Sequence, residues 1–531
     1  MSWKKVLVLL LALVLVGTLA AACKKKEEPK AGPTPGQQEP KKEEPKKEEP
    51  KKEEPKVIDK PLVIGMGADP NSLDPHALND GNERLITANI FEPLVRQLPT
   101  SFELKPLLAT KWENVNDTTW RFWLRNDVKF HNGEPFNAES VAGTVKRALN
   151  PELNSGYLDL WEGISDAKVV EPFVVDIITK DRNPLVPMRM AWFPMMDPKY
   201  VQSVGKDVVE KAVGTGPYKL VKWDRGSGIE LARNDAYWGP KPAIGKVTFK
   251  FQKEDATRLM ALRNGEVHIA RDMLPEFKDQ MPGFKSISGV EFPVFRINAK
   301  HPILKDKRIR QALNYAVDKE ALKDQLYSGF ARVTQCQQGK VEFPGGNPNL
   351  KPYPLDVAKA KQLLADAGYK GQKIEMIGER GRWLKDGELI EAVGAMVKDI
   401  GVNVDVKILE FSKWLEVYFD LGNPTDLIFV SNSFDLGDQD RPFSGYIAST
   451  GRSSTYLDNI PDLDAKILEL RSEMDIQKRN AGYAALWERA CDDPPWIYLL
   501  NLDDIYGVDP NLNFDPRQDQ KILVQEITWK K

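Results

Sequence analysis

The chain has 531 residues, of which 41% are hydrophobic and 9% aromatic. At roughly 100–200 residues per domain, this length predicts two or three domains with sizeable cores. The 75 Lys and Arg residues nearly balance the 77 Asp and Glu residues, which gives a formal charge of −2. The composition therefore indicates a globular protein and gives no electrostatic reason to expect nucleic acid as a partner.

The amino terminus has the pattern of a secretion signal. Two lysines precede the apolar run Val6–Val16, and three alanines lead from it to Cys23. The run is shorter than the roughly 20 apolar residues of a membrane-spanning helix, which favours a cleaved signal peptide at residues 1–22 over a membrane anchor. The ending Leu-Ala-Ala-Ala-Cys resembles a bacterial lipobox. The resemblance implies that Cys23 is lipid-modified and that the mature protein is extracytoplasmic and anchored to a bacterial membrane, in the periplasm or at the cell surface.

Residues 23–60 are rich in Lys, Glu and Pro and contain three copies of the sequence KKEEP. A segment with so few apolar residues cannot bury enough surface to offset the entropy lost on ordering. We expect it to be a disordered tether that holds the folded body away from the membrane. Its paired glutamates neutralise the lysines, which argues against a role in binding nucleic acid.

The stretch from Thr118 to Pro151 predicts a compact strand and helix unit. Alternating apolar and polar residues indicate a strand at 120–124, and Val128 and Phe130 indicate a second strand before a turn that contains Gly and Pro. Asn137 is expected to cap a helix that ends before Pro151.

The amino-acid sequence of this unit closely resembles a signature of family 5 of the solute-binding proteins, which serve bacterial ABC importers of oligopeptides, dipeptides and nickel. Further sequence motifs that resemble those of the family occur along the chain in the order that the family has. They are IFEPL at 90–94, GTGPYKL at 214–220, RQALNYAVDKEAL at 310–322, LDVAKAKQLLADAGY at 355–369 and PPWIYLL at 494–500. The resemblance covers nearly the whole body that follows the tether.

The resemblance implies an α/β, two-lobed periplasmic-binding-protein-like fold with a hinge and an extra small subdomain. The expected parts are lobe I at residues 61–98, 205–292 and 493–531, the extra subdomain of lobe I at 99–204, and lobe II at 293–492.

Two stretches alternate strand, helix and strand, the pattern of a parallel sheet. The first has strands at 245–252 and 267–270 around a helix at 256–264. The second has strands at 373–377 and 402–408 around a helix at 388–400.

Ligands of open α/β sheets bind beyond the carboxyl ends of the strands, so we expect a site where the loop 378–383 meets the segment 431–435, which follows an apolar strand at 427–430. Asp435 is expected to pair with an ammonium group, and Arg380 or Arg382 with a carboxylate. Apolar walls are expected from Phe434, Trp383 and Trp414.

In peptide-binding relatives an Asp that resembles Asp435 holds the amino terminus of the peptide. Here Asn432 replaces the Trp of that motif and Gln439 replaces its Pro. In the alternative interpretation, Asp435 caps its own loop and the two arginines are solvated.

The two remaining cysteines, Cys336 and Cys491, are 155 residues apart. An extracytoplasmic compartment permits a disulfide, but this separation says nothing about proximity, and we expect two buried thiols instead.

These patterns predict a receptor, not an enzyme. We expect it to capture a short peptide between two lobes and to deliver it to an ABC permease, acting as a monomer with no catalytic residue, metal site or cofactor. Family members also take nickel chelates, haem, sugars and opines, so a non-peptide solute is the alternative. A hydrolytic enzyme and a scaffold lipoprotein are the competing classes. The common hydrolase motifs and the P-loop are missing, and the four histidines are not spaced as metal ligands.

Overall fold

The computed structural model describes residues 60–77, 80–153, 155–157, 161–418, 420, 425–434, 436–449 and 462–531, all within one compact unit, Pro55–Lys531. The predictions for the signal peptide, for Cys23 and for residues 23–59 of the tether lie outside the described residues. Within the described part of the chain, no helix is both long enough and apolar enough to cross a membrane.

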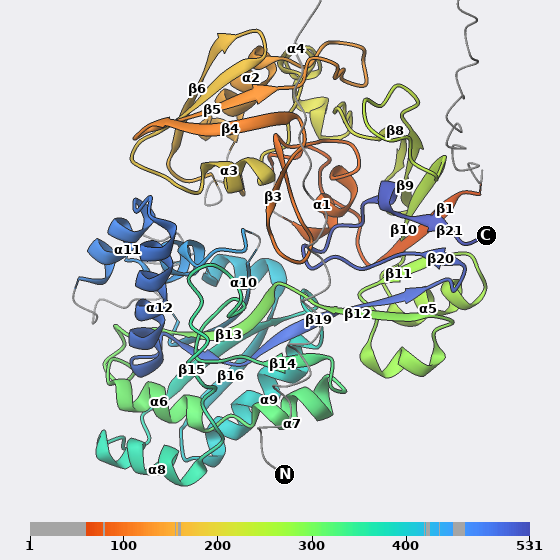
Figure 1. Cartoon of the computed structure of the whole chain (residues 1–531). Helices are drawn as coiled ribbons and strands as arrows, with labels where there is room; N and C mark the ends of the chain where they lie inside the picture. The colour runs from red at the N-terminus through yellow and green to blue at the C-terminus, as the bar shows by residue number, and fades with distance from the viewer. Residues whose placement is uncertain are drawn as a thin grey trace, which may run out of the picture. The chain divides into compact units, whose positions relative to one another are not determined.

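An eight-stranded sheet gathers strands from both ends of the described chain (Figure 1). In sheet order its strands are β12 (Phe284–Ser288), β19 (Leu500–Val508), β11 (Ile269–Arg271), β1 (Leu62–Met66), β10 (Lys246–Phe251), β9 (Gly228–Arg233) and β8 (Tyr218–Asp224), and β14 (Ala331–Val333) also pairs with β19. Strand β1 is parallel to β10 and β11, which α5 (Asp255–Arg263) connects. The predicted parallel strand–helix–strand unit is therefore confirmed here.

A five-stranded sheet has the order β16 (Val404–Glu410), β15 (Ile374–Arg380), β17 (Leu427–Ser433), β13 (Glu291–Ile297) and β18 (Trp496–Tyr498). Strand β15 is parallel to β16 and β17, and α9 (Asp386–Asp399) connects β15 to β16, as predicted. Side chains of this sheet pack in one core with α6 (Lys307–Tyr315), α8 (Val357–Asp366) and α9, which lie near one another in Figure 1. Strand β15 extends to Arg380, so half of the predicted loop 378–383 belongs to the strand.

A four-stranded antiparallel sheet has the order β4 (Ala109–Asn116), β5 (Thr119–Leu124), β7 (Val174–Thr179) and β6 (Ile164–Glu171). Helix α2 (Ala138–Ala148) packs on β6 and β7 and begins at Asn137, whose side chain accepts a hydrogen bond from the backbone N–H of Ser140. The predicted strand at 120–124 and the predicted cap are confirmed. The strand predicted at Val128 and Phe130 is wrong, because the chain makes a single bridge there, between Lys129 and Pro135, and then turns.

Other strands and α-helices complete the described chain. The strands are β2 (Val95–Gln97), β3 (Leu104–Pro106), β20 (Leu512–Asn513) and β21 (Thr528–Trp529). The helices are α1 (Gly81–Thr87), α3 (Val186–Arg189), α4 (Pro198–Val204), α7 (Lys319–Ala321), α10 (Phe411–Tyr418), α11 (Leu463–Arg471) and α12 (Ile476–Asp492).

Apart from the short strand β14, whose Ala331 packs in the core beside the five-stranded sheet, the chain passes between the eight-stranded and five-stranded sheets from β12 to β13 and again from β18 to β19. Asn501, the second residue of β19, connects these two crossings by hydrogen bonds. Its side-chain amide donates hydrogen bonds to the carbonyls of Gly289 (3.1 Å) and Glu291 (3.0 Å), and the hydroxyl of Ser288 lies 2.7 Å from its side-chain oxygen. Because Asn501 is buried, these bonds are shielded from competing water.

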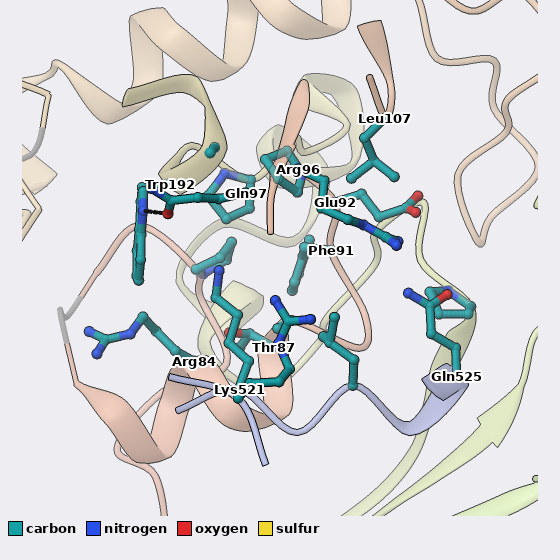
Figure 2. Close-up of a pocket in the computed structure, with 18 of the residues that line it drawn as sticks. Arg84, Thr87, Phe91, Glu92, Arg96, Gln97, Leu107, Trp192, Lys521 and Gln525 are labelled. Carbon is teal, nitrogen blue, oxygen red and sulfur yellow. Dashed lines mark hydrogen bonds between the residues drawn. The ribbon is translucent and has the colours of Figure 1, made fainter. Parts of the chain in front are cut away.

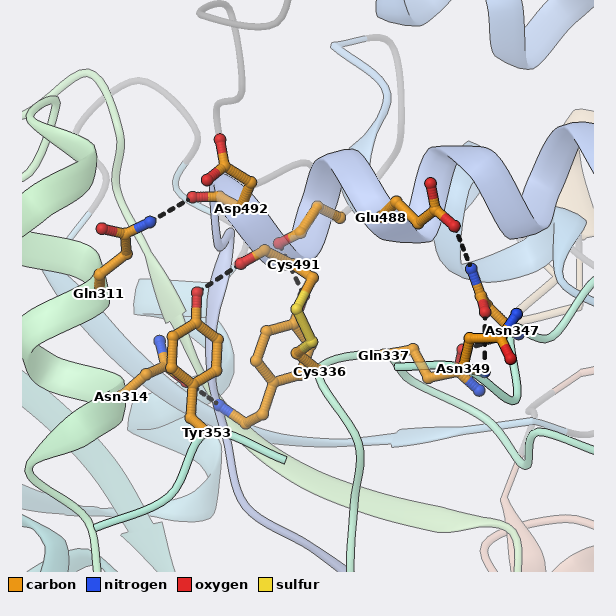
Figure 3. The surroundings of a disulfide bond; sticks show 12 residues. Gln311, Asn314, Cys336, Gln337, Asn347, Asn349, Tyr353, Glu488, Cys491 and Asp492 are labelled. Carbon is orange, nitrogen blue, oxygen red and sulfur yellow. Dashed lines mark hydrogen bonds between the residues drawn. A yellow bond between two sulfur atoms is a disulfide. The ribbon is translucent and has the colours of Figure 1, made fainter. Parts of the chain in front are cut away.

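Cys336 and Cys491 form a disulfide, with 5.1 Å between their Cα atoms (Figure 3). The expectation of two separate thiols was wrong, because packing against the end of α12 brings together two residues that their sequence separation left unrelated. The hydroxyl of Tyr353 donates a hydrogen bond to the carbonyl of Cys491, and the side chain of Gln311 donates one to the carbonyl of Asp492 (2.7 Å). The bond therefore joins the segment after β14 to the carboxyl end of α12.

Replacing both cysteines, Cys336→Ala with Cys491→Ala, should lower the free energy of unfolding by about 2–5 kcal/mol, because the unfolded chain regains the freedom that a cross-link of long span removes. Urea unfolding of the oxidised protein, the reduced protein and the double variant measures this loss. The reduced protein should resemble the variant, and a variant as stable as the oxidised protein would contradict the expectation.

Candidate ligand-binding site

A cavity of about 930 Å³ lies between residues of the eight-stranded sheet and residues of the five-stranded sheet. One wall comes from the loop after β1, the start of α1, the segments after β10 and β11, and the middle of β19. The opposite wall comes from the loop after β15, helix α10 and the end of β17. The carboxyl ends of parallel strands thus meet at the cavity from both sheets, which is the expected position of a ligand site in an α/β fold.

The wall from the five-stranded sheet is aromatic. Trp414 stacks on Tyr418 with 4.7 Å between ring centroids, and Trp383 meets Trp414 edge to face at 5.8 Å. The indole N–H of Trp414 donates a hydrogen bond to the carbonyl of Phe429 (3.2 Å), which fixes its ring. Phe411 and Tyr446 also line the cavity. Such rings offer large apolar faces with little side-chain freedom to lose on binding.

The cavity lining is charged, but its charges are balanced. Seven basic and seven acidic side chains line the cavity. The basic residues are Arg84, Lys253, Arg258, Arg271, Arg382, Lys385 and Arg441, and the acidic residues are Asp69, Glu254, Asp255, Asp272, Glu291, Asp503 and Asp504. A lining with both signs and no large excess suits a ligand that carries both signs itself.

The cavity brings together three of the six predicted contact residues, Arg382, Trp383 and Trp414. Arg380 is exposed and forms an ion pair with Glu391 on α9, 3.1 Å away. Phe434 is buried in a cluster of phenylalanine rings and contacts Phe292. Neither Arg380 nor Phe434 is among the residues that line the cavity.

Asp435 itself lies outside the described residues, but both of its sides are fixed in the structure. On one side Phe434 is buried. On the other side Asp438 forms a buried two-pronged ion pair with Arg479, at 2.7 Å for both hydrogen bonds. The role of Asp435 as a ligand contact stays a prediction.

Asn432, which the family resemblance places at the position of a Trp, lines the cavity. Its side-chain oxygen accepts a hydrogen bond from Arg296 (2.9 Å), and its amide donates one to Gln338 (2.6 Å). The departure from the family motif therefore puts a smaller, polar side chain, already held by two partners, into the cavity wall.

Asp386, which was not predicted from the sequence, organises the loop that carries Arg382 and Trp383. Its buried carboxylate accepts hydrogen bonds from the backbone N–H groups of Gly381, Arg382, Trp383 and Gly387, at 2.7–3.1 Å. A carboxylate that collects several N–H groups fixes a loop firmly, because each bond is charge-assisted. An Asp at the first position of a helix that follows a strand was the available signal.

The carboxyl group of Glu379, at the end of β15, lies buried beside Asp386. Burial and the neighbouring negative charge of Asp386 raise the pKa of Glu379 to about 9. Glu379 therefore stays protonated at neutral pH.

Two ion pairs connect the walls of the cavity. The guanidinium of Arg382 lies 3.3 Å from the carboxylate of Asp80, the residue that caps α1, and the ammonium of Lys385 lies 3.1 Å from Glu276. Both basic residues come from the loop that Asp386 holds. This loop thus contacts the opposite side of the cavity in the present arrangement.

The charged wall, including Arg258 and Arg271, was not predicted from the sequence. Both lie in or just after the unit β10–α5–β11, and their guanidinium groups reach the cavity from the carboxyl side of those strands. The strand-end rule, applied only to the second strand–helix–strand unit, would have located them had it been applied to the first as well.

No group of three or more His, Cys, Asp or Glu side chains in the described ranges is arranged to hold a metal ion. The cavity thus offers ion pairing, hydrogen bonding and aromatic contact to a ligand.

Comparison with protein families decides the class. Residues 103–454 match the model of the bacterial extracellular solute-binding proteins, family 5. The chain belongs to this family. Family 5 consists of solute-binding receptors, so this protein is a receptor and not an enzyme, as the sequence predicted.

Relatives whose names give different ligands are similar to this chain in sequence. The glutathione-binding protein GsiB of Salmonella choleraesuis is 28% identical over 461 residues, which are 83% of this chain and 89% of the relative. The nickel-binding periplasmic protein of Escherichia coli is 30% identical over 311 residues, which are 56% of this chain and 59% of the relative.

Solved structures of family 5 type share the fold. NikA from Brucella suis in complex with Fe(III)-EDTA has a TM-score of 0.80 at 25% identity and covers 89% of this chain and 100% of its own. DppA from Helicobacter pylori in complex with the peptide STSA has a TM-score of 0.74 at 23% identity and covers 89% of this chain and 98% of its own. The predicted α/β, two-lobed fold is confirmed.

Replacing Asp386 with Asn should loosen the loop that carries Arg382, because an amide cannot replace a carboxylate that collects four N–H groups. Losing even one charge-assisted bond, worth about 1.5–3 kcal/mol, raises the open population of a loop roughly 10- to 100-fold. The initial rate of trypsin cleavage after Arg382, followed by mass spectrometry, measures this change. Glu388→Asn, an exposed acid in the same helical turn, is the matched control and should cleave like the parent.

Replacing Glu379 with Gln should flatten the dependence of stability on pH. The folded protein holds the proton of Glu379 up to about pH 9, whereas the unfolded chain releases it near 4.5. The free energy of unfolding of the parent therefore falls as pH rises between these values, and the Gln variant lacks this contribution. Thermal unfolding at pH 5 and pH 8 should show the variant gaining stability relative to the parent at pH 8. The same gain in Glu391→Gln, an exposed control on α9, would contradict the assignment.

Proposed function

We propose that this family 5 protein is the lipid-anchored receptor of an ABC import system and that it captures short peptides. The observation that carries the proposal is the cavity, whose lining combines balanced charges with a wall of aromatic rings. A short peptide has an ammonium group at one end, a carboxylate at the other and side chains that can lie against rings. The cavity volume of about 930 Å³ is also within the range of pockets that enclose molecules of this size.

The relatives support a peptide without deciding the ligand. The peptide STSA is bound to DppA and a nonapeptide to AppA from Bacillus subtilis, and glutathione, named for GsiB, is itself a small peptide. Other relatives carry Fe(III)-EDTA or agropinic acid. Among these chemistries, a lining with equal numbers of positive and negative groups matches a zwitterionic peptide better than a ligand of uniform charge.

The proposed mechanism is closure of two lobes around the solute. We assign the eight-stranded sheet without β14 to lobe I, the five-stranded sheet together with β14 to lobe II and the four-stranded sheet to the extra subdomain, with the crossings at Gly289 and Leu499 as the hinge. A ligand that contacts both walls binds the closed arrangement better than the open one, and so shifts the population towards it. The closed form is then the one that the permease receives.

Native mass spectrometry of the full-length chain, purified gently in detergent, tests the proposal. A spread of added masses that fit short peptides would support it. A single sharp non-peptide mass would overturn it in favour of a specialised receptor. For a bare protein, calorimetric titration with tri-, tetra- and pentaalanine follows, and the absence of binding to all three would also overturn it.

Replacing Asp435 with Ala should weaken binding of trialanine roughly tenfold or more, because a charge-assisted contact to the free ammonium group is worth about 1.5–3 kcal/mol. The affinity for N-acetyl-trialanine, which lacks that charge, should change less than twofold by the same reasoning. Titration calorimetry of both peptides measures the difference.

The matched control is Asp515→Ala, since Asp515 is a nearly fully exposed acid that pairs with Lys285. It should bind both peptides like the parent. Equal losses for the free and the acetylated peptide in Asp435→Ala would exclude the amino-terminal contact.

A further inference from the structure

A second, smaller cavity of about 80 Å³ lies apart from the ligand cavity (Figure 2). Its walls come from α1, the segment Phe91–Gln97, residues around Trp192 and the carboxyl-terminal segment Arg517–Gln525. Of their lining residues, the two cavities share Arg84. The proposed capture of a solute between the lobes gives this second cavity no role.

The charges of the small cavity are strongly one-sided. Four basic side chains, Arg84, Arg96, Arg517 and Lys521, line it together with one acid, Glu92. The ligand cavity has no such excess, with seven basic and seven acidic side chains. The small cavity is therefore suited to a negatively charged group.

Three of these five charged groups have carboxylate or hydrogen-bond partners in the protein, and one of them is Lys521, whose ammonium lies 3.9 Å from the carboxylate of Asp519. Arg517 is held by Asp519 (2.7 Å) and by Glu526 (3.1 Å). The carboxylate of Glu92 accepts hydrogen bonds from the side chains of Thr215 (2.8 Å), Tyr237 (2.7 Å) and Trp238 (2.9 Å). Burial raises the pKa of Glu92, a shift that favours its neutral form and so weakens its opposition to a nearby anion.

Trp192 positions two further cations at the cavity. The ammonium of Lys521 lies 4.3 Å from the centroid of the Trp192 ring, and the guanidinium of Arg84 lies 5.3 Å from it. The ring is itself fixed, because its N–H donates a hydrogen bond to Gln97 (3.0 Å), whose amide donates one to the carbonyl of Leu436 (2.8 Å). Figure 2 shows Lys521 and Arg84 on the same side of the cavity as Trp192, with the bond to Gln97 dashed.

Arg96 is the cation that the protein leaves available. It belongs to β2 and lies beside Glu92 in Figure 2, and its charge acts on the Glu92 carboxyl. Among the residues that the structure describes, no group accepts a hydrogen bond from its guanidinium and no carboxylate forms an ion pair with it. A guanidinium on a cavity wall presents a planar pair of N–H donors that matches a carboxylate.

We propose that this small cavity binds the carboxylate of a small organic acid, with Arg96 as its two-pronged partner and Lys521 and Arg84 adding positive charge. Apolar side chains complete the lining, including Phe91, Leu107 and Leu523, and they suit a short hydrocarbon end better than the fully polar surface of a phosphate. An engineered cavity of about 150 Å³ accommodates benzene in another protein, so a cavity of this size suits an acid of only a few heavy atoms.

Propionate is the probe that tests the site, and propionamide, which has the same shape without the charge, is its matched control. Saturation-transfer NMR titration of the full-length chain in detergent should show binding of propionate and at least tenfold weaker binding of propionamide. Equal binding of the two probes would overturn the proposal, because the cavity would then select the hydrocarbon end and not the anion.

Variants locate the site. Arg96→Met keeps the aliphatic stem and should weaken propionate at least tenfold, whereas Arg263→Met, which removes an exposed arginine of α5, should leave it within twofold of the parent. Tyr446→Ala in the ligand cavity should also leave propionate binding unchanged. Loss of binding in Tyr446→Ala, or full binding in Arg96→Met, would overturn the proposal. Because propionate binding is measured independently of peptide binding, a failure of the carboxylate site can be distinguished from a failure of the proposed function.

Discussion

The buried side chain of Asn501 is the contact on which the two-walled arrangement depends. It bonds to the backbone on both sides of the β12–β13 crossing while it stands at the β18–β19 crossing itself. A change of angle between the two sheets must be absorbed by backbone dihedrals near this point, because the strands on either side are fixed by their ladders. The shape of the cavity depends on this connection, because the walls of the cavity are the ends of strands from the two sheets that Asn501 links.

The two walls of the cavity would contribute differently to the free energy of ligand binding. The aromatic side comes from rings that pack on one another, with Trp414 anchored to the carbonyl of Phe429, so this wall is largely preformed. The charged side consists of long side chains that must exchange protein partners or water for a ligand. Affinity for varied solutes can rest on the first wall, while the second discriminates by charge, which is how electrostatic complementarity usually acts.

The sequence predicted elements whose signals are local and missed features that depend on tertiary packing. The cap at Asn137 and the strand–helix–strand units follow from spacing within a dozen residues, and the structure has them. Asp386 was overlooked because a carboxylate in the first turn of a helix is usually interpreted as a simple favourable charge, whereas here the loop folds back onto it. Phe434 and Arg380 were expected at the ligand for their position near strand ends, but the side-chain directions that turn them towards Phe292 and Glu391 are not encoded in spacing. The disulfide, whose cysteines have a sequence separation of 155, had no local signal at all.

That disulfide has a consequence for how the protein is made. Family 5 proteins work outside the cytoplasm, and a chain exported from its amino-terminal end exposes Cys336 to an oxidising compartment before Cys491 has emerged. During that interval the first thiol is without its partner and open to exchange with other thiols. Correct pairing then requires that the whole segment between the two cysteines, which includes the β15–α9–β16 unit, has crossed the membrane first. Translocation order and oxidative maturation are thereby linked in this receptor.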